Sequence, residues 1–162
     1  MNSRLLGAGI VVPILIVSIG LFIYNSASST ITDSISSLST QEVEAFNNQF
    51  TSYEGKQTGS NVKALMGRLI ANANTYSDEC SKVPQVYINQ MSEESSESME
   101  VTYTENDDGD TNNYINDLGK IRNLIETKHE YYIEITYQNN GLIDYIQISY
   151  DAENPIWEYK YR

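Results

Sequence analysis

The feature of this sequence that most constrains its fold is the stretch at residues 5–24, LLGAGIVVPILIVSIGLFIY, which carries no charge over 20 positions. An α-helix of that length is about 30 Å long, which matches the hydrocarbon core of a bilayer. Because only a helix satisfies its own backbone hydrogen bonds there, we expect a helix despite Pro13. The stretch therefore predicts an uncleaved transmembrane signal anchor.

A cleaved signal peptide is the alternative for the same stretch. The apolar region of a signal peptide is usually about 7–15 residues long, which is shorter than the region found here. Ser26, Ala27 and Ser28 nevertheless offer a weak cleavage site, so cleavage stays open.

The distribution of charge predicts the orientation of the chain. Arg4 and the α-amino group precede the apolar stretch, and the next basic residue after it is Lys56. The positive-inside rule then places residues 1–4 in the cytoplasm and the C-terminal part outside, in a single-pass protein of the cell membrane. The chain contains 22 Asp and Glu but 10 Lys and Arg, for a formal net charge of −12. This balance argues against nucleic acid as a partner, since phosphate binding needs clustered basic residues.

Beyond the apolar stretch the sequence divides into a stalk and one domain. Residues 25–40 are rich in Ser and Thr and predict a polar stalk. Residues 41–162 are long enough to bury a core and predict a single extracytoplasmic domain. One Cys makes no internal disulfide, and one Cys with one His is too few for a zinc site.

Hydrophobic periodicity predicts two or three helices in this domain. Thr40 caps a short helix that Gly55 ends, and Ser60 caps a second, strongly amphipathic helix. Asn112 caps a further helix that runs to about Thr127. The expected apolar faces consist of Val43, Phe46, Phe50 and Tyr53, then Val62, Leu65, Met66, Leu69, Ile70 and Ala73, then Tyr114, Leu118, Ile121 and Ile125.

Short strands and a C-terminal hairpin complete the prediction. Pro84 opens one strand, and residues 101–103 are a candidate for another. A two-residue turn at Asn140 and Gly141 predicts a hairpin in which Asn139 pairs with Leu142. The expected pairs are Ile135–Ile146, Ile133–Ile148 and Tyr131–Tyr150 on one face, and Glu134–Gln147 and Tyr132–Ser149 on the other.

A last strand is expected after Pro155, because Trp157, Tyr159 and Tyr161 alternate with polar residues. Together these elements predict the α+β class. We expect two or three helices packed on an antiparallel sheet that ends in a C-terminal hairpin or meander.

His129 and Cys80 are single residues of their kinds in the chain. Nucleophilic catalysis would need the two in contact, with a third group orienting the base. The sequence places Cys80 in a polar loop and His129 at a helix-to-strand junction, so we expect a loop thiol and a surface histidine. No nucleophile elbow, P-loop or His-Glu-x-x-His motif occurs. We therefore predict no catalytic residue and no cofactor, while a thiol link between two chains leaves self-association open.

Residues 93–110 carry eight acidic residues and no basic one. An EF-hand loop needs Asp at its first position and Glu at its twelfth, but alignment on the glycine puts Thr104 and Ile115 there. A looser calcium site is the alternative to a solvated acidic loop. Its ligands would be Asp107, Asp108 and Asp110.

The chain contains 13 tyrosines, many of them on the expected strands. Tyrosines on a sheet face bind sugars or other proteins, because the ring is apolar and the hydroxyl is polar. They are also good strand formers, which is the alternative explanation. The candidate partner-contact residues are Tyr132, Tyr145 and Tyr159.

The block FNNQFTSYEGKQTGSNVKALMGRLIANAN, followed by the Tyr-rich hairpin, is similar to small, uncharacterised, single-pass proteins of Gram-positive bacteria. The resemblance implies a membrane anchor and an outward domain, and it implies no reaction. Type IV pilins give an analogy only, since their Glu near the start of the apolar stretch is absent here. The residues that carry the resemblance are Phe46, Asn47, Phe50, Tyr53, Gly55, Gly59, Ser60, Val62, Lys63, Leu65 and residues 141–148.

The anchor, the stalk and the absence of a catalytic motif predict a membrane-anchored, extracytoplasmic protein-interaction module. Its partner would be a protein, contacted as a minor component of a surface or secretion assembly. One alternative is a small carboxylate-dependent cell-wall hydrolase, which would need two acids within about 5–10 Å in a cleft. The other is a calcium- or ligand-sensing ectodomain.

Overall fold

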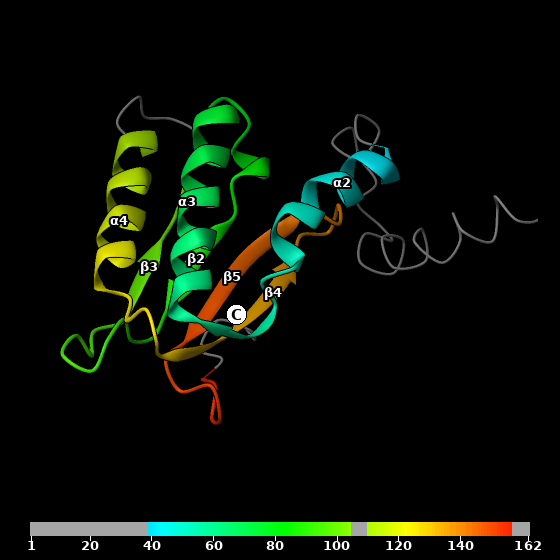
Figure 1. The fold of residues 1–162 in the computed structure, drawn as a ribbon. Helices are drawn as coiled ribbons and strands as arrows, with labels where there is room; N and C mark the ends of the chain where they lie inside the picture. The colour runs from blue at the N-terminus through cyan, green and yellow to red at the C-terminus, as the bar shows by residue number, and fades with distance from the viewer. Residues whose placement is uncertain (1–38, 105–109, 157–162) are drawn as a thin grey trace, which may run out of the picture. The chain divides into compact units, whose positions relative to one another are not determined.

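The computed structural model describes residues 39–104 and 110–156 of the chain. These residues form an α+β structure with three α-helices and a five-stranded sheet in the order β1-β4-β5-β2-β3 (Figure 1). None of the described helices has the length and apolar character needed to cross a membrane. The predicted membrane helix at 5–24 and the predicted stalk before Ser39 lie outside the described residues.

The described chain forms two compact units. The smaller unit comprises residues 39–47 and Tyr137–Leu142, and the larger one comprises the other described residues. Helix α2 (Thr40–Thr51) begins in the smaller unit and ends in the larger one.

In the smaller unit, a reciprocal pair of hydrogen bonds begins helix α2. The Glu42 backbone N–H donates to Ser39 Oγ at 3.2 Å, and the Ser39 N–H donates to Glu42 Oε2 at 2.7 Å. This is a capping box, in which each residue satisfies a backbone donor of the other. The predicted cap at Thr40 is therefore wrong by one residue, because Ser39 has the Glu three positions later.

The turn of the C-terminal hairpin also lies in the smaller unit. Its Gly141 N–H donates to the Gln138 carbonyl at 2.9 Å, and the Gln138 N–H donates to the Leu142 carbonyl at 2.7 Å. The loop thus has three residues, and the predicted Asn139–Leu142 pair is wrong. Gly141 has φ +86°, which is the left-handed conformation that closes a type I turn with a bulge. Asn47 Nδ2 donates to the Gly141 carbonyl at 2.8 Å.

The sheet of the larger unit is mixed. β2 runs parallel to β5, with Val86 opposite Ile146, and it runs antiparallel to β3, while β1 is antiparallel to β4. The prediction of a purely antiparallel sheet is therefore wrong. Parallel neighbours need a long crossover, and here it contains β3, α4 and β4, so no local turn signal marks the pairing. The strands are β1 (Gly55–Thr58), β2 (Gln85–Ile88), β3 (Met99–Val101), β4 (Glu130–Tyr137) and β5 (Ile143–Ser149).

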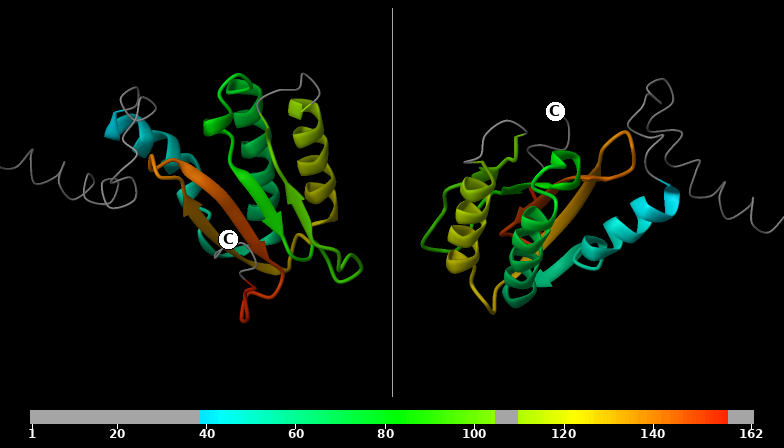
Figure 2. Two further views of the ribbon diagram at one scale, coloured as in Figure 1. Left: turned by 180° about the vertical axis from the view of Figure 1, so that it is seen from behind. Right: turned by 90° about the horizontal axis from the view of Figure 1, so that it is seen from above.

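Helices α3 (Gly59–Thr75) and α4 (Asp110–Leu124) pack side by side on one face of this sheet (Figure 2). The predicted apolar faces of both helices are confirmed, apart from the half-buried Ile70. The buried residues are Val62, Leu65, Met66, Leu69 and Ala73 in α3, Tyr114, Leu118 and Ile121 in α4, and Ile125 just after it. Facing them in the strands are the predicted core residues Tyr131, Ile133, Ile135, Ile146 and Ile148, all buried.

The second face of the central strands differs from the prediction. Gln147 and Ser149 are each 1% exposed and Tyr87 is 2% exposed, although alternation had predicted a solvent-facing row there. β2 and β5 are interior strands of the sheet, and interior strands are buried on both faces more often than edge strands. The predicted last strand, with Trp157, Tyr159 and Tyr161, lies outside the described residues.

Candidate functional site

The strand order brings three connections together at one end of the sheet. β2 and β5 are parallel, so their carboxyl ends meet there, and the Tyr150 N–H donates to Asn89 Oδ1 at 2.8 Å. β4 begins at the same end, because it lies next to β5 and runs in the opposite direction. His129 immediately precedes β4 and therefore lies beside Tyr150.

The carboxylate of Glu126 joins these connections. Glu126 lies between α4 and β4. Its Oε1 accepts a hydrogen bond from the backbone N–H of Glu93 at 2.7 Å, and its Oε2 accepts one from the Tyr150 hydroxyl at 3.2 Å. One side chain thus connects the segment after α4, the β2–β3 connection and the segment after β5. We call the group formed by Glu126, His129, Tyr131 and Tyr150 the Glu126 cluster.

His129 is held on both sides of its ring. The imidazole stacks on Tyr150, with ring centroids 3.8 Å apart and planes at 11°. Nε2 lies 2.7 Å from the Tyr150 carbonyl oxygen, which only accepts, so Nε2 carries a proton. Nδ1 lies 4.0 Å from Glu126 Oε2. His129 lies at the helix-to-strand junction where it was expected, and 31% of its side chain is exposed, but its ring is also held by Tyr150, which the sequence had not indicated.

Tyr131 is the fourth residue of the Glu126 cluster. Its hydroxyl donates to the Met91 carbonyl and accepts from the Glu126 backbone N–H at 3.0 Å. Its ring lies edge-on to Tyr150 with centroids 5.6 Å apart. Burial raises the pKa of Tyr131 to about 12. The pKa of Tyr150 is raised by desolvation and by its hydrogen bond to Glu126.

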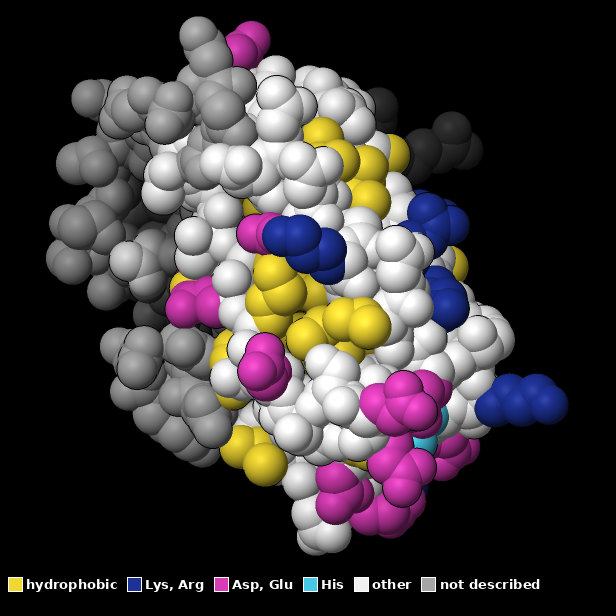
Figure 3. Space-filling model, turned by 90° about the vertical axis from the view of Figure 1, so that its left-hand side faces the viewer, with side chains coloured by type: hydrophobic (Ala, Val, Ile, Leu, Met, Phe, Trp, Pro, Cys, Tyr) yellow, Lys and Arg dark blue, Asp and Glu magenta, His cyan; other side chains and the backbone are white. Residues whose placement is uncertain are grey.

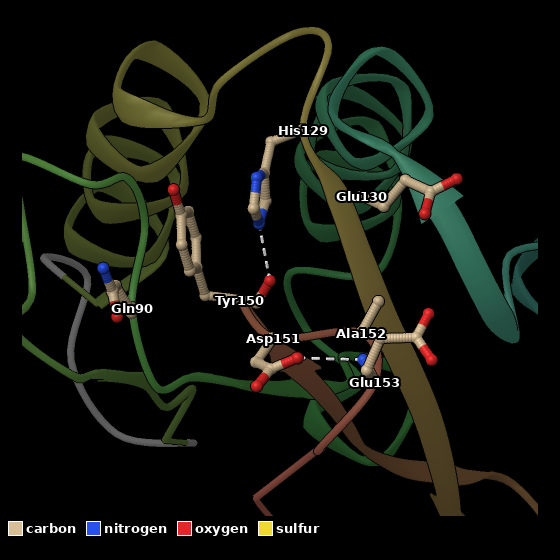
Figure 4. A pocket seen from close by; sticks show the side chains of 7 residues that line it. All are labelled: Gln90, His129, Glu130, Tyr150, Asp151, Ala152 and Glu153. Atoms are coloured by element: carbon tan, nitrogen blue, oxygen red, sulfur yellow. Dashed lines mark hydrogen bonds between the residues drawn. The ribbon is translucent and has the colours of Figure 1, made fainter.

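Next to the cluster lies a pocket of about 460 Å³ (Figure 4). Figure 3 shows Asp and Glu side chains gathered around the single histidine on this side of the molecule. Three carboxylates line the pocket, and its described lining residues include no Lys or Arg. The lining consists of Gln90, His129, Glu130, Tyr150, Asp151, Ala152 and Glu153.

The floor of the pocket is a turn held by Asp151. Its Oδ1 accepts from the backbone N–H groups of Glu153 at 2.9 Å and Asn154 at 3.1 Å. These bonds to Asn154 and Glu153 hold the pKa of the Asp151 carboxyl below its usual value. Asp151 is therefore ionised at neutral pH and committed to the turn.

Lys56 of β1 reaches the rim of the same pocket. Its ammonium forms an ion pair with Glu153. The hydrogen bond to Glu153 raises the pKa of Lys56, burial opposes this, and the charges of Glu153 and Glu130 add to the rise. The rim of this pocket therefore stabilises a positive charge.

A close backbone contact positions the Glu126 cluster. The Gly59 N–H donates to the His129 carbonyl at 2.8 Å, and the Ser60 N–H donates to the Thr127 carbonyl at 3.0 Å. A Cβ on Gly59 would lie 1.8 Å from the Glu126 carbonyl oxygen. Helix α3 begins at Gly59, so the predicted cap at Ser60 is wrong, and the Ser60 hydroxyl faces the Thr127 carbonyl instead.

The predicted tyrosine contacts lie elsewhere. Tyr132 is half-buried on β4 opposite Lys56 of β1. Tyr145 is half-buried on β5 and its hydroxyl donates to Glu100 Oε1 at 2.8 Å. Neither residue lines the pocket, and Tyr159 lies outside the described residues.

The other predicted sites are not assembled in the described residues. Cys80 lies in a 3-10 turn (Cys80–Lys82) before β2, whereas the pocket takes Gln90 from beyond the far end of that strand, so Cys80 and His129 are not brought together. Asp107 and Asp108 of the calcium hypothesis lie outside the described residues. Among residues 39–104 and 110–156, no group of three His, Cys, Asp or Glu side chains is arranged to hold a metal ion.

Comparison of the chain with protein-family models, with curated proteins and with solved structures gives no match. The Glu126 cluster and its pocket were not predicted from the sequence. One signal did point to them: the predicted hairpin brought Tyr131 near Tyr150, although the turn from which that register was counted proved wrong, and His129 precedes Tyr131 by two residues.

Proposed function

We propose that this chain is a membrane-anchored, extracytoplasmic protein-interaction module, anchored by residues 5–24 with its N-terminus in the cytoplasm. The uncharged stretch and the acidic remainder of the sequence support this assignment. The contact site of the module is the pocket beside the Glu126 cluster. Tyr132 and Tyr145 on the sheet, together with Tyr159 outside the described residues, form the second proposed contact region.

The observation that carries the proposal is that the fold already engages two of the polar groups around the pocket, His129 Nε2 and the Asp151 carboxylate. His129 donates from Nε2 to a carbonyl and faces a carboxylate with Nδ1, and Asp151 accepts hydrogen bonds from two backbone donors of its own turn. A general base must instead offer an unengaged lone pair to the substrate. Groups fixed in this way form a rigid recognition surface.

A carboxylate-dependent hydrolase is the second candidate, because Glu130, Asp151 and Glu153 line one pocket. Such an enzyme needs one carboxyl with a raised pKa to protonate the leaving group. The pKa of Asp151 is lowered, and Glu153 is paired with Lys56. Incubation of the full-length chain with purified cell wall distinguishes the two functions. We expect no release of soluble fragments, and release that is lost in Glu130→Gln would favour the hydrolase.

Site-specific photo-cross-linking in intact cells tests the interaction module. In the test variant, a photoreactive residue replaces Glu130, which is exposed at the pocket. In the matched control, the photoreactive residue replaces Leu124, which is 44% exposed at the end of α4 and does not line the pocket. We expect one protein to be captured reproducibly from position 130 and not from position 124. Equal capture from both positions, or capture of this chain alone, would contradict the proposal.

A further inference from the structure

The pocket beside the Glu126 cluster has a charge that its lining does not balance. Glu130, Asp151 and Glu153 contribute three carboxylates, and His129 is the one described lining residue able to carry a positive charge. Asp151 is stabilised by its own turn, so Glu130 and Glu153 remain to interact with an incoming group. An exposed pair of carboxylates alone is an ordinary solvated surface.

A second, independent observation comes from β1. Lys56 extends from the neighbouring strand to Glu153 at the pocket rim, and its pKa is raised by Glu153 and Glu130. The ion pair of Lys56 therefore shows that the carboxylates at this rim stabilise an ammonium group. Lys56 does not line the pocket itself, so its side chain closes one edge and leaves the interior to another group.

The shape of the pocket suits a long cationic side chain. A volume of about 460 Å³ lies within the range of small-ligand sites. Ala152 and the stacked rings of His129 and Tyr150 offer apolar surface to an aliphatic stem. The carboxylates of Glu130 and Glu153 lie on the side of the pocket toward β1 and point away from the rings (Figure 4). Lys and Arg bury their stems in this manner and keep the charged end against carboxylates.

We propose that this pocket binds a Lys or Arg side chain of a basic segment on the partner protein, in competition with Lys56. The inference rests on the proposed function and adds the chemistry of the partner. In the free protein the Lys56 ammonium pairs with Glu153 at the pocket rim. The cationic side chain of the partner displaces Lys56 from this ion pair.

The test measures binding of a short, capped peptide with two lysines to the full-length chain in nanodiscs of zwitterionic lipid. The matched peptide carries norleucine in place of lysine, which keeps the stem and removes the charge. We expect the lysine peptide to bind and the norleucine peptide not to bind, with NMR shifts at His129 and Glu130. Equal binding of both peptides, or shifts elsewhere only, would overturn the inference.

Charge-matched variants separate a built site from general attraction to an acidic chain. Glu153→Gln and Glu130→Gln are each expected to weaken binding about two- to fivefold, the range of an exposed ion pair. Glu97→Gln removes the same charge from an exposed position outside the pocket and is expected to leave binding unchanged. Equal weakening by all three variants would mean non-specific attraction and would overturn the inference.

Substitution of Lys56 is expected to change the affinity for the lysine peptide in the opposite direction. Lys56→Gln is expected to tighten binding about two- to fivefold, because the competitor is removed. The control Lys120→Gln removes a lysine that pairs with Asp117 on α4 and is expected to change nothing. If the peptides do not bind while photo-cross-linking from position 130 still captures a partner, this inference fails and the interaction module stands.

Discussion

Replacement of Gly59 by alanine tests how the fold positions the Glu126 cluster. The added Cβ would lie 1.8 Å from the Glu126 carbonyl oxygen, 2.6 Å from the carbonyl carbon and 3.0 Å from Thr127 Cα. All three atoms belong to the backbone, so no side chain can rotate away. Since ordinary contact begins at 3.4 Å, the start of α3 and the α4–β4 connection must separate by about 1.5 Å.

The expected cost follows from what this separation breaks. The hydrogen bonds from Gly59 N–H to His129 and from Ser60 N–H to Thr127 measure 2.8 and 3.0 Å, so neither survives such a movement. Each contributes about 1 kcal/mol, and overpacking adds about 1–3 kcal/mol. Alanine is the better helix former by up to about 1 kcal/mol, which offsets part of the loss. We expect Gly59→Ala to lower the free energy of unfolding by about 2–4 kcal/mol.

Urea denaturation of the full-length chain in mild detergent, followed by near-UV circular dichroism, measures this change. Gly119→Ala in α4 is the matched control, because a Cβ there meets nothing within 4 Å. We expect this control to be stabilised by up to about 1 kcal/mol. NMR ring-current shifts of His129 should also change in Gly59→Ala only, since its stack on Tyr150 depends on the displaced connection. A Gly59→Ala protein as stable as the original chain would refute the reasoning.

Three further predictions concern single contacts. Tyr114→Phe removes the donor to the Pro84 carbonyl at 2.6 Å and leaves that buried acceptor unpaired, so calorimetry should show a loss of about 1–3 kcal/mol. Ser39→Ala removes the capping box of α2 at a cost of about 0.5–2 kcal/mol to that helix, which should appear as faster hydrogen exchange at Glu42 and Val43 with core amides unchanged. Burial raises the pKa of Tyr131 from 10.0 to about 12, so its contribution to stability is fully present below pH 10 and is lost as the pH rises through about 12. Unfolding measured between pH 9 and about 11.5 should therefore depend less steeply on pH in Tyr131→Phe, and an unchanged slope would contradict this.

Local patterns predicted the helices and the two strands of the hairpin, but not β1 (Gly55–Thr58). The apolar stripe of α3 and that of α4 follow a helical period, and the residues on them are buried. The alternation of Ile133, Ile135, Ile146 and Ile148 likewise identified the core face of the hairpin. These predictions succeed because burial of one face imposes a period on the sequence, whatever the neighbouring element is.

The predictions of the helix cap and of the hairpin turn were wrong because these features depend on individual hydrogen bonds and not on hydrophobic periodicity. Ser39 and Thr40 stand side by side at the start of α2, and only Ser39 has a Glu three positions later that returns a hydrogen bond. The hairpin turn has Asn139, Asn140 and Gly141 in sequence, which fits a two-residue or a three-residue loop equally well. The protein adopts the three-residue loop, in which Gly141 forms the bulge. The side chain of Asn47, far away in the sequence, donates a hydrogen bond to the Gly141 carbonyl.

The parallel pairing of β2 with β5 could not be predicted from the sequence for a different reason. β2 has four residues and carries no mark of its partner or direction, while β5 carries a turn signal for its hairpin neighbour β4 alone. The crossover between them is built from elements that were each predicted, but the order β1-β4-β5-β2-β3 follows only from packing. The site depends on this order, since it brings Gln90 and Tyr150 to one end of the sheet.

The candidate site was hidden because its central residue is one of many acidic residues in the chain. Glu126 is one of 22 acidic residues, and nothing in its neighbourhood distinguishes it from a solvated helix end. Its role arises from three donors or rings that come from separate connections: the Glu93 N–H, the Tyr150 hydroxyl and the His129 ring. In an acidic chain of this kind a single carboxylate is therefore distinguished by the groups that hold it, and the nearness of Tyr131 to Tyr150 is the part of that arrangement that the hairpin pattern indicated.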